Sequence, residues 1–323
     1  MPIVEAPNSL REAVREAAIA GLSSSPKTLP PWLFYDEAGS KLFDEITELP
    51  EYYLTRTERE LFKQLAPQLY RYFSGPVTVA ELGAGSAGKT GVLLSELASR
   101  QRGLLYQPID VSASALEDAA AALTRFIPGL QVQPQVANYI TENYEIERPA
   151  GSEVFALYIG SSIGNFDPAE QRAILQKLRE HLLPGDTLLL GVDLAPSAGK
   201  CVNALLKAYN DAAGVTAAFN KNVLVRLNRE LDADFDLEGF AHEARWNAER
   251  SRIEMHLISL APQVVHVEGE RFVFAKGETI HTENSYKFTD ASLEALLTDV
   301  GFAKSETVLD AHGCYAVAMA RAV

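Results

Sequence analysis

Apolar and polar positions follow two different rhythms along this chain, and each rhythm predicts one kind of secondary structure. Near the start, apolar residues three and four positions apart predict amphipathic helices. These helices are expected at 9–22, at 41–47 and from about 57 to 73. From residue 77 onward, short apolar runs typical of buried strands alternate with helical stretches. The predicted strands are 77–82, 104–109, 130–136, 154–160 and 187–192, and the helices among them are 89–100, 113–126 and one starting at Asp167.

Two of these helices carry local start signals. Thr57 and Glu60 have the spacing of a capping box, which predicts a helix that begins near residue 57. Asp167, Pro168 and Glu170 occupy the sequence positions expected for an N-cap, N1 and N3. Both helices are therefore predicted from specific residues as well as from periodicity.

The alternation predicts an α/β fold with a mostly parallel sheet covered on both faces. It stops after Asp193, where helices are expected over 200–229 and antiparallel strands at 252–260 and 271–275. The last forty residues return to the first rhythm, with a helix at 291–300 and a terminal hairpin formed by 306–309 and 314–320. A middle insertion therefore divides the α/β domain.

We expect two domains, each made of two stretches of chain. Residues 58–196 and 287–323 form the Rossmann-like α/β domain with its terminal antiparallel hairpin. Residues 9–57 and 197–286 form a second α+β domain.

Composition narrows the possible partners. The 323 residues include 29 Lys and Arg against 43 Asp and Glu, a formal net charge of −14. This charge speaks against a nucleic-acid or anionic membrane surface, and no apolar run approaches the roughly 20 residues of a membrane span. The start of the chain lacks the pattern of a secretory signal, so we expect a cytoplasmic protein. Cys201 and Cys314 are expected to be buried structural thiols, and the six histidines lack zinc-motif spacing.

The stretch VTVAELGAGSAGKT (77–90) matches three ligand-binding patterns at once. Its glycines spell the GxGxxG of a dinucleotide site, and GxxxxGKT spells a P-loop. ELGAG also matches the acidic first motif of S-adenosylmethionine (SAM) methyltransferases. In all three, glycines turn the chain sharply and let a ligand approach the backbone.

Two carboxylates bear on this choice. Glu81 is expected at the tip of the first strand beside the ligand, where it would repel a triphosphate and attract the cationic SAM. Asp110 closes the second strand, where a carboxylate accepts hydrogen bonds from a ribose diol. Asp110 suits NAD equally, and GVDL around Asp193 resembles the acidic strand of a P-loop enzyme. These residues favour SAM and leave the other two interpretations open.

Longer motifs resemble one family. KTLPPWLFYDEAGSKLFDEITELPEYYLTRTE (27–58) followed by ELGAGSAGKT is similar to the histidine-specific Nα-methyltransferases of ergothioneine biosynthesis. GSSIGNF (160–166), AYNDAAGVTAAFNKNVL (208–224), RIEMHL (252–257) and TENSYKF (282–288) resemble the same family. The resemblance implies a SAM methyltransferase domain, a second substrate-binding domain, and transfer of three methyl groups to the α-amine of histidine, giving hercynine.

The resemblance also implies site residues. Gly83, Lys89 and Asp110 match SAM-binding positions. Asn138 and Tyr139 align where the family usually has an Asp-Phe pair at the adenine, and an amide oxygen accepts a hydrogen bond more weakly than a carboxylate.

The histidine pocket is expected to draw on both domains. Tyr52, Asn165 and Tyr209 match positions that hold the carboxylate and amine of histidine, and Tyr35 matches a tyrosine near the amine. The remaining matched residues lie around the imidazole: Glu283, Ser285 and Met255.

The sequence thus predicts a SAM-dependent L-histidine Nα-methyltransferase that needs no metal and is expected to be a monomer. The alternative within this class is an enzyme acting on another aromatic amino acid or on a histidine derivative. The alternative outside it is a P-loop nucleotide-binding enzyme.

Overall fold

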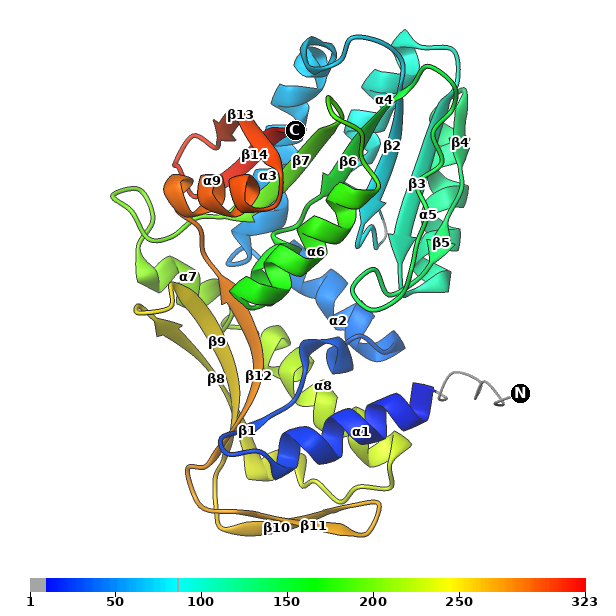
Figure 1. The fold of residues 1–323 in the computed structure, drawn as a ribbon. Helices are drawn as coiled ribbons and strands as arrows, with labels where there is room; N and C mark the ends of the chain where they lie inside the picture. The colour runs from blue at the N-terminus through cyan, green and yellow to red at the C-terminus, as the bar shows by residue number, and fades with distance from the viewer. Residues whose placement is uncertain (1–9, 86) are drawn as a thin grey trace, which may run out of the picture. The chain divides into compact units, whose positions relative to one another are not determined.

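The computed structural model describes residues 10–85 and 87–323. Contacts within the chain divide it into two compact units, each built from two separate stretches. Unit 1 comprises the chain up to Tyr53 together with Cys201–Ser285, and unit 2 comprises Leu54–Lys200 with Tyr286–Val323. In Figure 1, which is coloured by residue number, unit 2 combines cyan and green segments with the red C-terminal strands.

Within the described residues, unit 2 is built on an eight-stranded sheet with the order β13-β14-β7-β6-β2-β3-β4, and β5 also pairs with β3. Its strands are β2 (Val77–Leu82), β3 (Leu104–Asp110), β4 (Leu130–Val132), β5 (Gln135–Val136), β6 (Glu153–Tyr158), β7 (Thr187–Asp193), β13 (Phe302–Leu309) and β14 (Tyr315–Ala322). The pairs among β2 to β7 are parallel, whereas β14 runs antiparallel to β7 and β13 antiparallel to β14.

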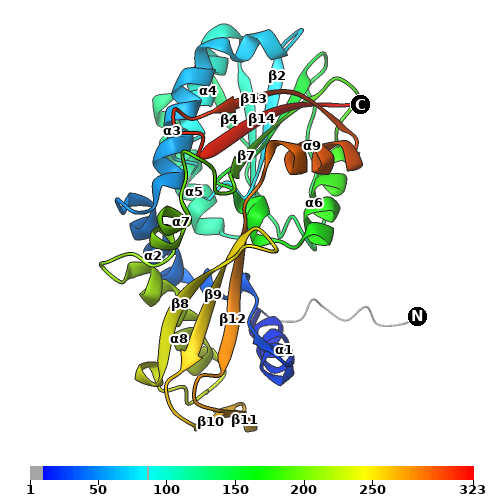
Figure 2. The same ribbon diagram turned by 90° about the vertical axis from the view of Figure 1, so that its left-hand side faces the viewer.

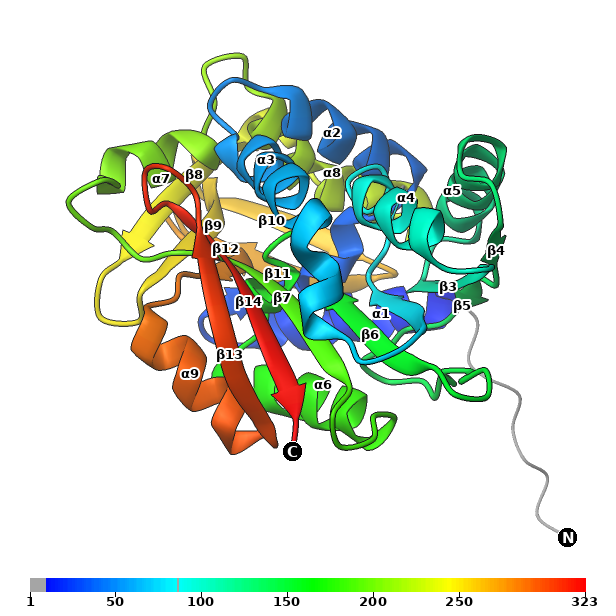
Figure 3. The ribbon, with the colours of Figure 1, turned by 90° about the horizontal axis from the view of Figure 1, so that it is seen from above.

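Helices cover both faces of this sheet. They are α3 (Tyr53–Leu65), α4 (Gly91–Arg100), α5 (Ala113–Phe126), α6 (Pro168–Glu180) and α9 (Asp290–Asp299), with the short 3-10 helices η2 (Ala66–Tyr72) and η3 (Ser162–Asn165). Viewed from above in Figure 3, α4 and α5 lie on one face and α6 and α9 on the other. Strands β2 and β7 are buried along their whole length, as a doubly covered parallel sheet requires. The predicted α/β fold with a terminal antiparallel hairpin is confirmed.

The strand order of unit 2 reverses between β2 and β6. The chain passes from β2 outward to β3 and β4, then returns to β6 on the other side of β2. In open α/β sheets, ligands bind at the carboxyl ends of the strands beside such a reversal. The loops after β2, β3 and β6 are therefore the place to look for a ligand site.

Unit 1 contains a four-stranded sheet with the order β1-β12-β9-β8 and the hairpin β10-β11, counted over the described residues. The strands are β1 (Lys27–Thr28), β8 (Phe240–Asn247), β9 (Arg252–Ser259), β10 (Gln263–Val267), β11 (Glu270–Phe274) and β12 (Thr279–Tyr286). The helices are α1 (Leu10–Ser23), η1 (Pro31–Phe34), α2 (Glu37–Glu48), α7 (Val202–Ala208), α8 (Val215–Glu230) and η4 (Leu237–Gly239). Figure 2 shows β8, β9 and β12 side by side with α8 behind them.

Polar residues of α8 connect the parts of unit 1. Asn222 donates a hydrogen bond to Asp36, the N-cap of α2, at 2.8 Å. Asn220 Oδ1 accepts from the Thr282 hydroxyl of β12 at 2.7 Å, and its Nδ2 lies 2.8 Å from Nδ1 of His242 in β8. Because these asparagines are buried, each needs such partners, and α8 thereby ties α2 to the sheet.

Helix α6 has the predicted start. Asp167 accepts hydrogen bonds from the amides of Ala169 and Glu170, and the Glu170 side chain accepts from the Asp167 amide. The predicted start of α3 is wrong, since the helix begins at Tyr53 and Thr57 lies inside it. Leu54 is buried on the same helical face as Leu61, so tertiary packing extends this helix beyond its local capping signal.

Two further expectations are wrong. The predicted strand over residues 130–136 is split into β4 and β5, because Pro134 lies between them and has no N–H for a ladder. Cys201 is exposed and Cys314 is half-buried, so neither is a fully buried thiol. Both lie in connections, at the start of α7 and before β14, where chains run near the surface. Among the described residues, no helix has the length and apolar character to cross a membrane.

Candidate functional site

Gly83 and Gly85 make the turn that follows β2. Both have positive φ angles, 67° and 51°, which residues with a Cβ adopt at a cost. The Gly83 amide donates to the carbonyl of Ile109 at 2.8 Å and ties the loop to β3. A Cβ added at Gly83 would lie 3.5 Å from the Tyr139 ring, whereas one at Gly85 would meet no atom of the described residues within 4 Å. The glycine loop therefore leaves open space beside its backbone.

Asp110 ends β3 and holds the two loops beside it. Its Oδ2 accepts from the Gly85 amide and its Oδ1 from the Ser112 amide, both at 2.9 Å. Each oxygen can accept a further hydrogen bond, so both can also serve a ribose diol. Val111 and Val136 beside it are 57% and 60% exposed, and Val136 pairs with Asp110 across the strands. A carboxylate flanked by uncovered apolar surface fits a nucleoside.

Asn138 and Tyr139 follow β5 at the same edge of the sheet. Asn138 Oδ1 accepts from the Ile140 amide at 3.1 Å, and the Asn138 amide donates to Glu142 at 2.7 Å. The Tyr139 ring packs edge-on against Tyr158, with 5.7 Å between centroids. Burial raises the pKa of Tyr139 to about 12, so its hydroxyl is neutral at physiological pH. The structure thus brings four predicted cofactor residues to one edge: Gly83, Asp110, Asn138 and Tyr139.

Glu81 differs from its predicted role. It is 1% exposed, and its oxygens accept from the hydroxyls of Thr90 at 2.9 Å and Tyr106 at 2.5 Å. Burial raises the pKa of Glu81 to about 7, although these two hydrogen bonds oppose the shift. The expectation that Glu81 faces the ligand is therefore wrong, since its carboxylate supports the glycine loop from inside the unit.

Lys89 is paired with a residue that the sequence analysis did not single out. Its Nζ donates to Glu58 Oε2 at 2.5 Å, and Glu58 is fully buried in α3. An acidic residue in an amphipathic helix is usually exposed, which is why Glu58 escaped notice. The available signal was its position on the helical face of Leu54, Leu61 and Leu65.

In unit 1, an aromatic row connects four of the predicted histidine-binding residues. The ring of Tyr35 lies 5.8 Å from that of Phe43, Phe43 lies 6.3 Å from Tyr52, and Tyr52 lies 6.3 Å from Tyr209. The Tyr209 hydroxyl then lies 2.7 Å from Ser285 Oγ. Phe43 lies within the helix predicted at 41–47, and its place in the row comes from tertiary packing.

Exposure changes along this aromatic row. Tyr35 is 38% exposed, whereas Tyr52 and Tyr209 are 8% and 7% exposed. Their low exposure shows that these two tyrosines are not ordinary surface residues. Because a buried hydroxyl needs a polar partner, each hydroxyl is expected to take part in a specific contact. The row therefore leads from an accessible tyrosine to the buried hydroxyl of Ser285.

Glu283 and Met255 are buried on neighbouring strands of the same sheet. Glu283 is 8% exposed on β12, two residues before Ser285, and Met255 is 1% exposed on β9. The Thr282 hydroxyl lies 3.0 Å from the Met255 carbonyl, which fixes β12 against β9 at this level. Unit 1 therefore contains a buried carboxylate, a hydroxyl and a thioether on two adjacent strands.

Asn165 belongs to unit 2, unlike the other predicted histidine-binding residues. It ends η3, the single turn that follows β6 at the carboxyl edge of the sheet. Ser161 turns the chain from β6 into η3 with a φ of 58°, and its hydroxyl accepts from the Asp193 amide at 2.9 Å. This hydrogen bond fixes the turn that carries Asn165.

Asp193 speaks against the P-loop interpretation. It is fully buried between two lysines, with Oδ1 2.5 Å from Lys200 Nζ and Oδ2 2.9 Å from Lys287 Nζ. Burial lowers the pKa of Lys200 to about 8, although the nearby Asp193 charge opposes this shift. A carboxylate already neutralised by protein cations is poorly suited to hold the magnesium ion of a nucleotide.

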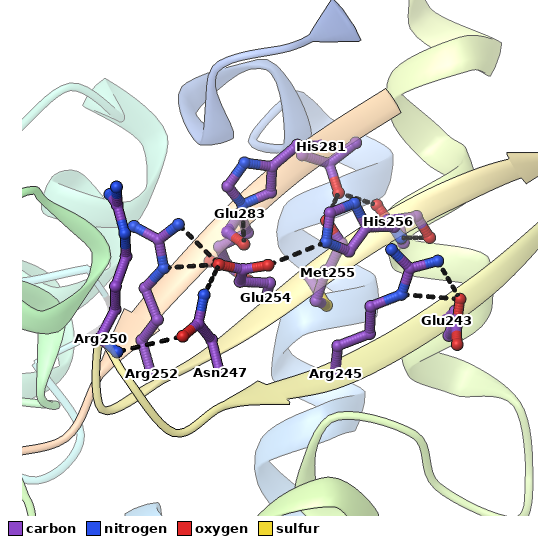
Figure 4. Close-up of polar contacts among 12 residues, drawn as sticks. Glu243, Arg245, Asn247, Arg250, Arg252, Glu254, Met255, His256, His281 and Glu283 are labelled. Carbon is purple, nitrogen blue, oxygen red and sulfur yellow. Dashed lines mark hydrogen bonds and ion pairs between the residues drawn. The ribbon is translucent and has the colours of Figure 1, made fainter. Parts of the chain in front are cut away.

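Glu254, His256 and His281 offer possible metal ligands within 4.8 Å of one another. As Figure 4 shows, Arg252 and Asn247 both donate to one oxygen of Glu254, and His256 lies 3.2 Å from the other. Burial alone would raise the pKa of Glu254, but these hydrogen bonds lower it to about 2.

The carboxylate of this group is already paired with a protein cation, Arg252. Burial and the neighbouring His281 lower the pKa of His256 to about 4, so His256 is neutral at pH 7. The Arg252 guanidinium occupies the carboxylate and repels a metal ion. We interpret the group as a polar network that joins β9 to β12 through the stacked rings of His256 and His281, whose centroids are 4.8 Å apart. On β12 itself, the His281 Nε2 lies 3.1 Å from the Glu283 carbonyl.

A parallel sheet that reverses between β2 and β6, with a glycine loop after β2 and a carboxylate ending β3, defines the class of Rossmann-like proteins that bind a nucleoside-containing ligand. A family model described as histidine-specific methyltransferase, SAM-dependent, matches residues 14–322. The chain belongs to this family, which confirms the predicted resemblance.

Individual relatives agree with the family assignment. The chain is 40% identical over 317 residues to the histidine N-alpha-methyltransferase of Mycolicibacterium smegmatis, covering 98% of this chain and 97% of the relative. It is 26% identical over 292 residues to ergothioneine biosynthesis protein 1 of Neurospora crassa, covering 85% of this chain and 31% of that protein. It is also 28% identical over 339 residues to the L-tryptophan methyltransferase of Psilocybe serbica, covering 96% and 93%.

Proposed function

We propose that this protein transfers methyl groups from SAM to the α-amine of L-histidine, giving hercynine as the first step of ergothioneine biosynthesis. The observation that carries the proposal is the buried Glu283 on β12, two residues before a Ser285 hydroxyl paired with Tyr209. A carboxylate and a hydroxyl can together satisfy both nitrogens of an imidazole. The family assignment and the 40% identical relative support the same reaction.

Unit 2 is proposed as the SAM-binding domain. The open space beside Gly85 and the carboxylate of Asp110 beside two exposed valines suit the adenosine part of SAM. Asn138 and Tyr139 are assigned to the adenine, and Gly83 to close backbone approach. Lys89 is assigned to the cofactor as a cation.

Unit 1 is proposed as the substrate-binding domain. Tyr52 and Tyr209 are assigned to the carboxylate and amine of histidine, together with Asn165 from unit 2. Tyr35, at the accessible end of the aromatic row, is assigned a place near the amine. Glu283 and Ser285 are assigned to the imidazole, and Met255 limits the size of the ring.

The chemistry needs alignment more than activation. Bound SAM supplies a methyl group on a sulfonium sulfur, and the leaving group is a neutral thioether. The protein's residues hold the amine neutral and in line for attack in a dry site. A proton must leave the amine before each transfer, and the Tyr35 hydroxyl or a water bound to it is the proposed carrier. No metal is required for such a displacement.

Another aromatic amino acid is the alternative substrate, because one relative is named as an L-tryptophan methyltransferase. The buried Glu283 favours histidine, since an indole offers a single N–H and a phenyl ring offers none. A ring without a matching donor forgoes the hydrogen bond that this carboxylate offers, which lowers its affinity relative to histidine. We therefore propose histidine, acted on by a cytoplasmic monomer that binds neither nucleic acid nor membrane.

The test is mass spectrometry of purified protein with L-histidine and excess SAM. We expect a product that has gained three methyl groups on the α-nitrogen, and no comparable product from tryptophan or phenylalanine. Methylation on the ring, or product formation from tryptophan alone, contradicts the proposal. Calorimetric titration with S-adenosylhomocysteine, ATP–Mg and NADH separates the SAM site from both nucleotide alternatives.

A further inference from the structure

Glu58 is a buried carboxylate of unit 2 that accepts hydrogen bonds on both oxygens. Its Oε1 accepts from the Gly160 amide at 2.8 Å and the Tyr315 hydroxyl at 2.6 Å. Its Oε2 lies 2.5 Å from the Lys89 ammonium. A charged group is stable inside a protein only when it is paired and hydrogen-bonded in this way. These three donors therefore hold the Glu58 carboxylate in a fixed position.

The backbone around the Glu58 carboxylate leaves room for this group and for the Lys89 ammonium. A Cβ at Gly191 of β7 would lie 2.2 Å from Glu58 Oε1, so a side chain there would displace the carboxylate. A Cβ at Gly160 would lie 3.2 Å from Lys89 Nζ, and Gly160 has a φ of 77°. One glycine on β7 and one in the turn after β6 thus accommodate the Glu58–Lys89 pair.

The Lys89 ammonium lies where a ligand is expected. It contacts the turn after β6, on the carboxyl edge of the sheet beside the reversal of strand order. An ammonium has three N–H donors. Among the described residues, the hydrogen-bond partner of the Lys89 ammonium is Glu58. Two of the ammonium's three N–H donors are therefore left for a ligand carboxylate. The Lys89 side chain is 23% exposed, whereas Glu58 is closed off behind it.

We propose that Glu58 is a positioning residue of the cofactor site, holding the Lys89 ammonium in place to receive the carboxylate of SAM. The inference rests on the proposed SAM site and extends it to a residue that does not touch the ligand. A lysine side chain is long and flexible, and ordering it during binding costs affinity. Glu58 removes that cost because it orders the lysine before the ligand arrives.

Calorimetric titration of the full-length protein with SAM and with S-adenosylhomocysteine tests this role. We expect Glu58→Gln to weaken both ligands at least tenfold, to raise the KM for SAM and to leave the KM for histidine within twofold. Glu60→Gln is the matched control, because Glu60 lies on the same helix in an exposed pair with Lys63. This control should bind both ligands like the wild type.

The two ligands separate positioning from a general charge effect. SAM carries a sulfonium charge that S-adenosylhomocysteine lacks. Loss of a distant negative charge should weaken SAM alone, whereas loss of lysine positioning should weaken both ligands equally. Weakening of SAM alone overturns the proposal.

A double-mutant cycle with Lys89→Met tests whether Glu58 acts through the lysine. We expect Glu58→Gln to have little further effect once Lys89 is methionine, and additive losses contradict the proposal. If Glu58→Gln does not fold, Glu58→Asp keeps the buried charge but withdraws it by one methylene, and unchanged binding there overturns the role. These titrations need no histidine, so their outcome is independent of whether histidine is the substrate.

Discussion

The hydroxyls of Tyr209 and Ser285 lie 2.7 Å apart and join the end of α7 to strand β12. Tyr209 is assigned to the amino acid end of histidine and Ser285 to its ring. One hydrogen bond therefore couples recognition of the two ends of the substrate. Either hydroxyl can be the donor in this bond, so Ser285 can still accept from or donate to the ring.

Tyr209→Phe tests this coupling. Because the variant loses one hydrogen bond worth about 0.5–1.5 kcal/mol, the KM for histidine should rise roughly two- to tenfold. The KM for SAM should stay unchanged, since Tyr209 lies in unit 1. Steady-state kinetics with each substrate varied in turn measures both values. A change in the KM for SAM alone contradicts the assignment of Tyr209 to histidine.

Substitution of Glu283 tests ring recognition. Glu283→Ala should lower kcat/KM for histidine at least tenfold, or about 1.4 kcal/mol of transition-state binding. Combined with Met255→Val, it should ease methylation of tryptophan, because a charge assigned to the imidazole and some bulk are removed. Kinetics with both amino acids on wild type and double variant measure the change. Equal efficiency with histidine in both proteins means that Glu283 does not face the imidazole.

Asp110→Ala tests the cofactor site. The carboxylate is predicted to accept hydrogen bonds from the ribose, so its loss should weaken SAM by about 1.5–3 kcal/mol. Asp110 also accepts from the amides of Gly85 and Ser112, and Asp110→Asn keeps one acceptor as a milder variant. Calorimetric titration gives both affinities. A folded Asp110→Ala protein that binds SAM normally removes Asp110 from the site.

Glu81 predicts a pH dependence of stability. Burial raises the pKa of Glu81 to about 7 in the folded protein, above the ordinary value of 4.5. Between these values the folded state holds a proton that the unfolded state releases. The free energy of unfolding therefore falls as pH rises through this window, by up to about 3 kcal/mol at pH 8.

Glu81→Gln lacks this titration and keeps a polar partner for Thr90 and Tyr106. Relative to the wild type, the variant should therefore gain stability between pH 5 and pH 8. Urea unfolding at the two pH values measures the difference. A difference between the two proteins that stays constant with pH shows that Glu81 does not titrate in this range.

Removal of metal should leave the reaction unchanged. A sulfonium leaves without assistance, and the possible ligands Glu254, His256 and His281 are engaged in a network with Arg252. Dialysis against a chelator should therefore preserve the rate of methylation. A loss of activity that zinc or another divalent ion restores contradicts the proposed metal-free mechanism, and His256→Gln would then show whether this group binds the ion.

The sequence by itself determined most elements of unit 2 and the order in which they occur. The strands Val77–Leu82 and Thr187–Asp193 are mostly apolar runs, and the start of α6 is encoded by Asp167, Pro168 and Glu170. The glycine loop and Asp110 belong to the same strand–turn–helix pattern. Such features depend on neighbouring residues, so they can be predicted without a fold. The long motifs also sufficed to identify the family.

Only the tertiary structure decided how distant side chains meet. Glu58 and Lys89 are 31 positions apart, and Tyr209 and Ser285 are 76 apart. A buried carboxylate such as Glu58 or Glu81 has the same local sequence signature as a solvated one. Its environment depends on which elements pack over it and which donors they supply. Burial and partner choice are properties of the packed fold, and periodicity along a single chain does not encode them.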